Sequence, residues 1–284
     1  MAPPIRIAFS PDSDDLFMFW ALLRGKIDTE GLSFTAERQD TESLNERVAR
    51  GDVDVCAVSI ARSAAIADDW LLLPHGMSVG RGYGPVVVAA TPCALSELEG
   101  RSVGTPGLRT TAHLILSLVA PKFVPVVLPI APFSLAFDAV RSGAVAAATL
   151  IHEGRLTYAE EGLTLVADLG VEWARLTGGL PLPLGGNVIA KRLGSERIAQ
   201  VSRLCRASIA WALDNRDEVM RGLAEEDGRG LALNQELVDT YLALYANTDT
   251  HEAPADVREA VRELFRRGHE AGLTPRPVDV AYAP

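Results

Sequence analysis

The sequence predicts an α/β protein with two mixed-sheet lobes and a helical C-terminal cover. Short apolar runs typical of strands alternate with helical patterns as far as Ala190. Two stretches, Gly80–Pro85 and Gly178–Asn187, are rich in Gly and Pro, and we interpret them as crossings between the lobes. From Ser195 onwards the pattern is helical. We therefore expect residues 1–85 and 187–284 to form the first lobe, and residues 86–186 the second.

The strands and helices follow in order. Strands are expected at Ile5–Phe9, Leu32–Ala36, Val53–Val58, Trp70–Leu73, Val86–Ala90, Ser102–Thr105, Val124–Leu128, Ala144–Ile151, Leu163–Leu169 and Asn187–Ala190. Helices are expected at Leu16–Leu23, Thr41–Gly51, Ile60–Ala67, Leu95–Gly100, Ala112–Val119, Phe133–Arg141, Leu156–Glu161, Val171–Leu176, Ile198–Leu213, Glu218–Leu223, Gln235–Tyr245 and Ala255–Arg267. The first helix is expected to have Ser13 or Asp14 as its N-cap.

Composition limits the classes of partner. Hydrophobic residues make up 48% of the 284 residues, enough for a full core, and the formal net charge is −10. This charge argues against a nucleic-acid partner, because phosphate binding uses clustered Lys and Arg. A small anionic ligand needs only a local group of donors. The sequence leaves the oligomeric state open.

Cysteine usage and hydropathy bear on the compartment. The three cysteines, Cys56, Cys93 and Cys205, show no zinc-site spacing, and a sparse, odd count is typical of a reducing compartment. Cys56 lies in an apolar run and is expected in the core. The N-terminus lacks the pattern of a secretory signal, and no apolar run is long enough for a membrane span. We expect a cytoplasmic protein with no membrane partner, and nothing indicates a metal or redox cofactor.

His152 is the strongest candidate for chemistry. It directly follows the apolar run Ala144–Ile151, which is typical of a buried parallel strand. In open α/β sheets, ligands lie outside the carboxyl ends of strands. We interpret His152 as a base or acid acting on a small ligand. The alternative is a histidine that satisfies a buried backbone carbonyl, and the role of the adjacent Glu153 stays open.

A glycine turn before the helix at Ala112 predicts an anion site. Free backbone N–H groups and the helix dipole at this N-terminus favour a carboxylate. Thr110 and Thr111 both lie there. Since a helix has one N-cap position, the second hydroxyl is expected to be spare for a ligand.

Further hydroxyl and carboxyl groups follow other predicted strands. Ser10 and Asp15 belong to the polar turn after the first strand, and Ser59 follows the third. All three are candidate ligand contacts, with helix capping as the alternative. Arg81, in the first crossing, is also a candidate, with a surface salt bridge as its alternative.

Several stretches are informative when they are taken together. They are G-R-G-Y-G-P at Gly80–Pro85, T-T-A at Thr110–Ala112 with L-S-L at Leu116–Leu118, I-H-E-G-R-L-T-Y at Ile151–Tyr158, and G-L-P-L-P-L-G at Gly179–Gly185. Together they resemble the 1,4-dihydroxy-6-naphthoate synthase family of the futalosine route to menaquinone. They occur in the family's order and span most of the chain.

The resemblance implies the bilobal fold of type II periplasmic binding proteins, serving here as an enzyme. It implies cleavage of cyclic dehypoxanthine futalosine to release 1,4-dihydroxy-6-naphthoate, with no cofactor. His152 matches the family's histidine base, Thr110 and Thr111 match its paired threonines, and Ser59 matches a family serine.

The first loop departs from the family pattern S-P-C-P-N-D-T. This chain has Ser10, Pro11, Asp12, Ser13, Asp14, Asp15 and Leu16 there. Arg109 stands where His is familiar, and Ala57 where Lys is. The added carboxyl groups would repel a carboxylate, and Arg109 is a candidate to offset them. A divergent subgroup with a modified substrate stays open.

Two alternatives to this enzyme remain. One is a cytoplasmic binding or sensing protein on the same fold, without turnover, for a small carboxylate. The other is a relative of chorismate dehydratase, against which the stretch at Ile151–Tyr158 argues.

Overall fold

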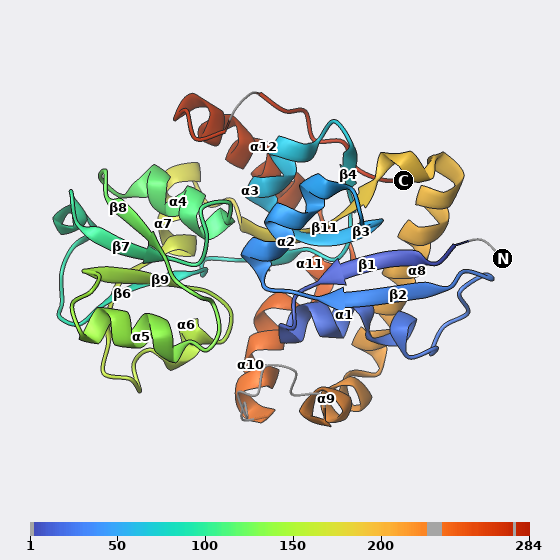
Figure 1. Cartoon of the computed structure of the whole chain (residues 1–284), viewed down its shortest axis with the longest axis horizontal. Coiled ribbons are helices and arrows are strands. Elements are labelled where there is room, and N and C mark those ends of the chain that lie inside the picture. Colours follow the sequence, from blue (N-terminus) through green and yellow to red (C-terminus); the bar gives the residue numbers. More distant parts are fainter. Residues whose placement is uncertain (1–2, 226–234, 275–276) are drawn as a thin grey trace.

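The computed structural model describes residues 3–225, 235–274 and 277–284, which form two lobes (Figure 1). The strands are β1 (Ile5–Phe9), β2 (Phe34–Arg38), β3 (Val55–Ser59), β4 (Trp70–Leu72), β5 (Ser78–Gly80), β6 (Val86–Ala89), β7 (Ser102–Thr105), β8 (Val124–Val127), β9 (Ala147–Leu150), β10 (Thr164–Asp168) and β11 (Leu182–Ala190). The α-helices are α1 (Ser13–Leu23), α2 (Thr41–Arg47), α3 (Ile60–Ser63), α4 (Thr111–Val119), α5 (Ser134–Arg141), α6 (Gly154–Thr157), α7 (Leu169–Thr177), α8 (Ser195–Asp214), α9 (Arg216–Glu225), α10 (Gln235–Tyr245), α11 (Thr248–His251) and α12 (Ala255–Glu270). The 3-10 helices are η1 (Val48–Arg50), η2 (Ala64–Ile66), η3 (Leu95–Leu98) and η4 (Lys191–Leu193).

Each lobe contains a mixed sheet, as predicted. The first sheet has the strand order β2-β1-β3-β11-β4, with β5 also paired to β11. The second has the order β10-β6-β9-β7-β8 and lies on the left of Figure 1. Strand β1 runs parallel to β3, and β7 runs parallel to β9. The carboxyl ends of each parallel pair therefore meet at one sheet edge, which brings the loops that follow them together.

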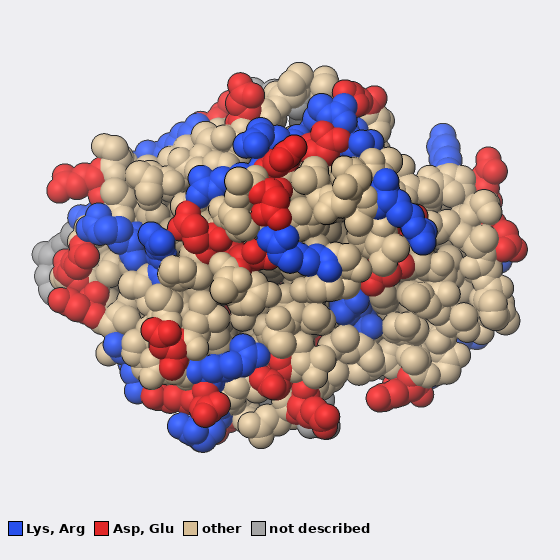
Figure 2. Space-filling model, turned by 180° about the vertical axis from the view of Figure 1, so that it is seen from behind, with Lys and Arg blue, Asp and Glu red and all other residues tan. Residues whose placement is uncertain are grey.

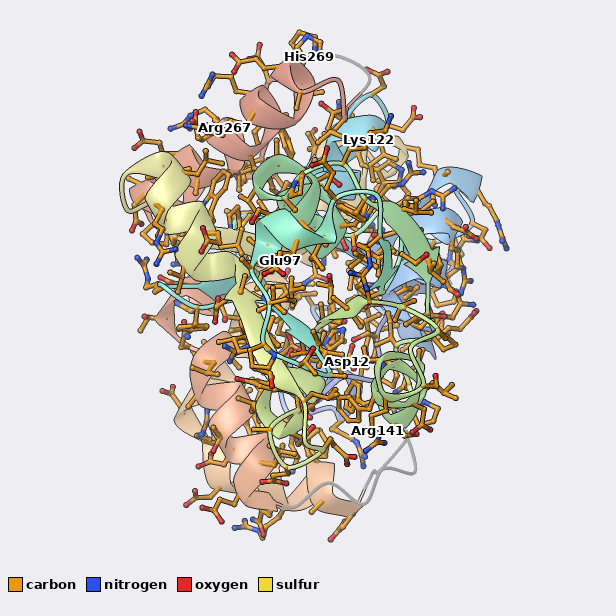
Figure 3. All side chains as sticks on the ribbon, turned by 90° about the vertical axis from the view of Figure 1, so that its left-hand side faces the viewer. Asp12, Glu97, Lys122, Arg141, Arg267 and His269 are labelled. Atoms are coloured by element: carbon orange, nitrogen blue, oxygen red, sulfur yellow. The ribbon has the colours of Figure 1, made fainter. Side chains whose placement is uncertain are left out.

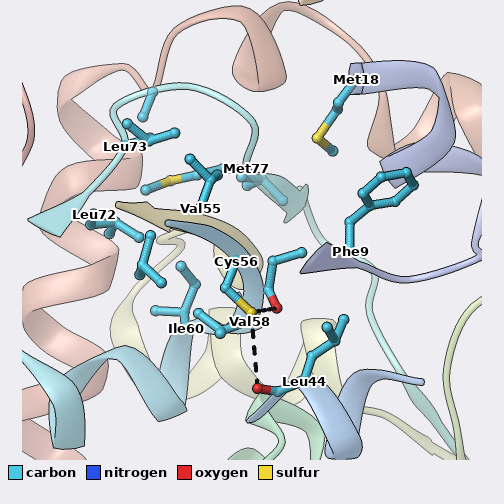
Figure 4. Close-up of a cluster of buried hydrophobic side chains, with 14 of the residues drawn as sticks. Phe9, Met18, Leu44, Val55, Cys56, Val58, Ile60, Leu72, Leu73 and Met77 are labelled. Atoms are coloured by element: carbon cyan, nitrogen blue, oxygen red, sulfur yellow. Dashed lines mark hydrogen bonds between the residues drawn. The ribbon is translucent and has the colours of Figure 1, made fainter. Parts of the chain in front are cut away.

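The central strands of the first sheet are buried on both faces. Phe9 of β1 and Val58 of β3 belong to one apolar cluster with Leu72 and Met77 (Figure 4). Cys56, expected in the core, is fully buried there, with its Sγ 3.5 Å from the Ala57 carbonyl oxygen. Burial raises the pKa of its thiol, so this cysteine stays protonated core.

The C-terminal helices cover the first sheet. Helix α8 packs along α1, where the Ser208 hydroxyl donates to the Met18 carbonyl oxygen at 2.8 Å and accepts from the Leu22 N–H. Helix α10 packs against α1 and β5. This packing carries one face of α10 to the region between the lobes (Figure 1).

Two features of the first sheet differ from expectation. Strand β11 begins at Leu182, not at Asn187, so the Gly/Pro stretch is largely strand. The register of β11 against β5 shifts between Pro183 and Gly185, which accommodates the proline in the sheet. A Cβ at Gly186 would lie 2.9 Å from Ile60 Cδ1, so the end of the Ile60 side chain would have to shift. The partner strand β5 was not expected from the sequence.

The surface carries both signs of charge. On the face shown in Figure 2, Lys and Arg side chains are interspersed with Asp and Glu. None of the helices formed by the described residues has the length and hydropathy that a membrane span requires.

Candidate active site

A cavity of about 100 Å³ lies where the loops after β1 and β3 face the loops after β7 and β9. The cavity is lined from both lobes and by the face of α10 that carries Tyr241 and Tyr245. It is lined by most of the candidates from the sequence, namely Ser10, Asp15, Ser59, Thr110, Thr111 and His152.

His152 follows the end of β9 in a strained conformation. Its φ is +51°, in the left-handed region that side chains other than glycine rarely adopt. Its Nε2 lies 3.2 Å from Asp12 Oδ2 and 3.4 Å from Thr41 Oγ1, and its Nδ1 lies 3.3 Å from the Tyr241 hydroxyl. The imidazole thus has side-chain partners on both nitrogens, not the backbone carbonyl considered as its alternative. Strain held by such contacts is typical of functional sites.

Four buried carboxyl groups lie at the start of α1 and in the loop after β9, which also carries this histidine. Asp12 is the N-cap of α1, in place of the predicted Ser13 or Asp14, because its backbone is extended and its carbonyl accepts the first helical bond from Leu16. Glu153 accepts a hydrogen bond from the Ser13 hydroxyl at 2.8 Å, which joins the two lobes. Asp14 and Asp15 complete the group. In Figure 3, Asp12 lies well inside the outline of the molecule.

Asp14 and Asp15 share one buried setting. Burial, together with the smaller effect of neighbouring carboxylates, raises the pKa of each carboxyl to about 7. Asp14 accepts from the Ser78 hydroxyl at 2.6 Å, and Asp15 accepts from the Ser10 N–H at 2.8 Å. The pair therefore holds protons near neutral pH. Within the described chain, no three His, Cys, Asp or Glu side chains are grouped to hold a metal ion.

The serines after β1 and β3 are fixed by their neighbours. The Ser10 hydroxyl accepts from the Asp12 N–H at 3.2 Å. The Ser59 hydroxyl accepts from Asn45 Nδ2 at 3.1 Å, and the Ser59 N–H donates to Asn45 Oδ1. Ser59 stands at the N-cap of α3 without making a side-chain capping bond. Its hydroxyl therefore faces the cavity in an orientation that Asn45 sets.

The paired threonines have different roles. Thr110 is the N-cap of α4, since its Oγ1 accepts from the His113 N–H and donates to the Gly107 carbonyl. Thr111 Oγ1 donates to the Leu184 carbonyl at 2.7 Å and accepts from the Ala61 N–H at 3.1 Å. The expectation that the second hydroxyl is spare is therefore wrong: it bonds β11 and α3 of the other lobe.

Arg81 and Arg109 do not line the cavity. Arg81 forms salt bridges with Asp249 and Asp256, both at 2.7 Å, so the surface ion pair considered for it is present. Arg109 is exposed, and its NH1 lies 3.0 Å from Glu42 and 2.9 Å from Glu46, both on α2. Its charge is therefore paired across the lobes, away from the acidic loop that it was expected to offset.

Three cavity-lining residues were not anticipated. Arg155 is the one Lys or Arg among the described residues of the lining, and it donates to the Gly84 carbonyl and to Asp168. The rings of Tyr241 and Tyr245 pack in a tilted arrangement, with 4.9 Å between centroids and 47° between planes. Their i, i+4 spacing on α10 was the available signal, because it places both rings on one helix face. Arg155 lies in the same stretch as His152, three residues on.

Comparison with known proteins identifies the family of this chain. Residues 5–270 match the family model described as menaquinone biosynthesis. The chain belongs to the menaquinone biosynthesis family. A protein of Thermus thermophilus named 1,4-dihydroxy-6-naphtoate synthase is 36% identical over 282 residues, covering 97% of this chain and 99% of the relative. A protein of the same name from Streptomyces coelicolor is 36% identical over 278 residues, covering 96% of each chain.

Solved structures place this member of the menaquinone biosynthesis family in the periplasmic-binding-protein fold. A crystal structure of a protein from Archaeoglobus fulgidus is 38% identical, with a TM-score of 0.87, and covers 95% of this chain and 98% of that one. The alkanesulfonate-binding protein SsuA from Xanthomonas axonopodis, bound to MOPS, has a TM-score of 0.70 at 18% identity, covering 99% and 98%. The second likeness concerns the fold alone. The bilobal fold expected from the sequence is confirmed.

Proposed function

We propose that this enzyme of menaquinone biosynthesis is a lyase that cleaves cyclic dehypoxanthine futalosine and releases 1,4-dihydroxy-6-naphthoate, with His152 as the proton acceptor. The observation that carries the proposal is His152 itself: a strained histidine at a strand end, half-buried in the cavity wall and bonded through both ring nitrogens. Imidazole is the side chain that takes up and releases protons most readily near neutral pH. The names of the relatives support the product, and the sequence resemblance described above suggests the substrate.

The cavity has groups suited to an aromatic carboxylate. The rings of Tyr241 and Tyr245 offer an aromatic wall, and offset or tilted stacking on such rings favours a fused ring system. Arg155 supplies the positive charge, because its guanidinium carries five donors and the neighbouring Gly84 carbonyl and Asp168 use only part of them. Protonation of Asp14 and Asp15 lowers the negative charge that a carboxylate meets there.

The test is direct incubation of the purified protein with cyclic dehypoxanthine futalosine, followed by chromatography for 1,4-dihydroxy-6-naphthoate. We expect product from the wild type, and a kcat lower by roughly 10²–10⁴-fold in His152→Ala, the usual contribution of a general base. The matched control is His269→Ala, because His269 lies on α12 at the edge of the molecule (Figure 3). This control is expected to keep both kcat and KM.

Each other outcome of this experiment would reject a particular part of the proposed function. Ligand binding by calorimetry without any product would reject the lyase and favour a binding or sensing protein. Product formation by His152→Ala at the wild-type rate would keep the reaction and reject His152 as the base. Neither binding nor product would show that the cleft takes another ligand.

A further inference from the structure

Three side chains form a continuous chain of polar contacts from the interior to the cavity. Asp12 Oδ2 lies 3.2 Å from His152 Nε2, and His152 Nδ1 lies 3.3 Å from the Tyr241 hydroxyl. Tyr241 and His152 line the cavity, whereas Asp12 lies behind them and does not. We infer that Tyr241 is a catalytic residue that exchanges the proton with the substrate, that His152 stores this proton, and that Asp12 positions the imidazole. This inference rests on the proposed function and deepens it.

The partner on Nε2 assigns the histidine tautomer. A carboxylate can only accept hydrogen bonds, so the contact with Asp12 favours the imidazole proton on Nε2, where the Thr41 hydroxyl at 3.4 Å can also accept. The lone pair of the neutral ring is then on Nδ1, where Tyr241 donates its hydroxyl proton. The basic nitrogen of His152 is therefore covered by the phenol and not open to a ligand.

The Tyr241 hydroxyl is suited to make contact with the substrate. A phenol oxygen that donates one bond keeps both lone pairs free to accept another. Burial raises the pKa of this phenol well above 10, and the charges of Asp14, Glu153 and Asp12 add to the effect. The phenol therefore stays protonated in the resting site. It can give its proton to His152 only while it takes up another proton from the substrate.

Proton transfer through this chain is balanced. The substrate C–H bond breaks, its proton bonds to the Tyr241 oxygen, and the phenol's own proton moves to His152 Nδ1. The bonding electron pair stays on the substrate carbon, and His152 becomes an imidazolium beside the Asp12 carboxylate. The electron pair on the substrate carbon then forms a double bond while the bond to the departing part breaks, and that bond's electron pair leaves with the departing part. The reverse transfer delivers the stored proton to this departing part. The chain is then regenerated without a co-reactant.

The surroundings favour the charged intermediate. The titratable groups that face Tyr241 and His152 come from α1, from the loop after β9 and from α10, and are Asp12, Asp14, Glu153 and Tyr245. Arg155 lies in the wall of the same cavity. Two of the four, Asp12 and Glu153, are carboxyl groups outside the proton-holding pair of Asp14 and Asp15, and negative charge on them stabilises a positive imidazolium in a low-dielectric site.

The kinetic test compares Tyr241→Phe with the wild type. The ring and its stacking on Tyr245 are kept, so we expect KM to stay within about threefold while kcat falls by roughly 10²–10⁴-fold. The matched control is Tyr282→Phe, whose hydroxyl makes no hydrogen bond within the described chain and which lies away from the cavity. Retention of kcat within about threefold in Tyr241→Phe would overturn the inference, because His152 would then meet the substrate directly.

The role of Asp12 is tested without relying on activity. Nitrogen-15 NMR of the five histidines at pH 8, with His152 assigned by its loss in His152→Gln, is expected to show the proton on Nε2. Asp12→Asn should abolish this preference and lower kcat by up to about 10⁴-fold, the effect of the same change in a Ser–His–Asp site. Asp12 makes no side-chain capping bond in α1, so the helix is expected to persist. The exposed Asp28→Asn is the control.

The outcomes separate this inference from the proposed function. An inactive wild type would reject the substrate assignment, and with it the catalytic role of Tyr241. An active wild type, an inactive His152→Ala and an active Tyr241→Phe would reject the phenol alone. A proton found on Nδ1 of His152 would reject the chain whatever the activity.

Discussion

The hydroxyl of Thr111 accepts a hydrogen bond from the backbone N–H of Ala61, across the line that separates the two sheets. The same hydroxyl donates to the Leu184 carbonyl of β11. One side chain at the start of α4 therefore satisfies two backbone groups of the other lobe, and it fixes how close the lobes lie where they border the cavity.

Thr111→Val should lower the free energy of unfolding by about 1–3 kcal/mol, because buried backbone groups lose their partner while the shape is kept. Urea denaturation at pH 8 measures this. Thr35→Val on the exposed face of β2 is the control, expected within about 0.5 kcal/mol of wild type. An equal effect of both variants would contradict the bridging role.

Asp14→Asn should stabilise the protein above neutral pH. The folded-state pKa of Asp14, raised by burial to about 7, lies above its unfolded value of 3.8, so the native state binds more protons between these values. The free energy of unfolding of the wild type then falls as the pH rises from about 4 to 7. The amide avoids this loss and can still accept from Ser78. We expect a gain of at least about 1 kcal/mol at pH 8, since one pKa unit equals 1.36 kcal/mol.

The measurement for Asp14 is denaturant unfolding of both proteins at several pH values. Wild type and variant should converge near pH 4, where both carry a neutral side chain. A constant difference at every pH would point to packing instead of ionisation.

His75→Leu should stabilise the protein, most of all in acid. His75 is buried, and neither ring nitrogen has a hydrogen-bond partner within the described chain. Burial lowers the pKa of His75 from 6.5 to about 3, with Arg206 and His251 adding to this effect. The unfolded state therefore binds more protons between pH 3 and 6.5, and stability is lost as the pH falls through this range.

Removing the unsatisfied ring should add about 1 kcal/mol at pH 8, at the low end of the cost of an unpaired buried group. At pH 4.5 the gain should be larger. Thermal melting at both pH values measures it, and a loss of stability at pH 8 would show that the imidazole has a partner, such as bound water.

Arg155→Gln should raise KM for the proposed carboxylate substrate by about tenfold or more, the value of a charged hydrogen bond worth roughly 1.5 kcal/mol. The control is Arg109→Gln, which removes an exposed charge that does not line the cavity. This control should change KM by less than about threefold and stability by no more than about 1 kcal/mol. Steady-state kinetics measures KM for each variant, and melting curves measure its stability. A larger effect on KM at Arg109 than at Arg155 would contradict the assignment of Arg155 as the substrate contact.

The alternation of apolar runs was sufficient to predict the fold. Strands such as Ile5–Phe9 and Ser102–Thr105 were placed at their observed bounds, because each is buried and ends at a polar turn. The start of strand β11 was predicted too far along the chain, because Gly and Pro usually interrupt strands. Only its pairing with β5 shows how the sheet accommodates them.

The site was predictable only where a residue follows a strand. The strand-end rule located His152, Ser10 and Ser59 in the lining. It could not locate Tyr241, because that residue reaches the cavity through the packing of α10 on α1 and β5. The contact between Asp12 and His152, 140 positions apart, likewise depends on how the two lobes meet.

The left-handed backbone of His152 lowers stability at the same position that we propose for the base. A non-glycine residue in this conformation costs roughly 1–2 kcal/mol, and Gly would relieve it. A library selected for heat resistance alone should therefore drift to Gly at position 152 and lose turnover. Engineering this enzyme for robustness requires that codon 152 be held fixed while the rest of the scaffold is varied.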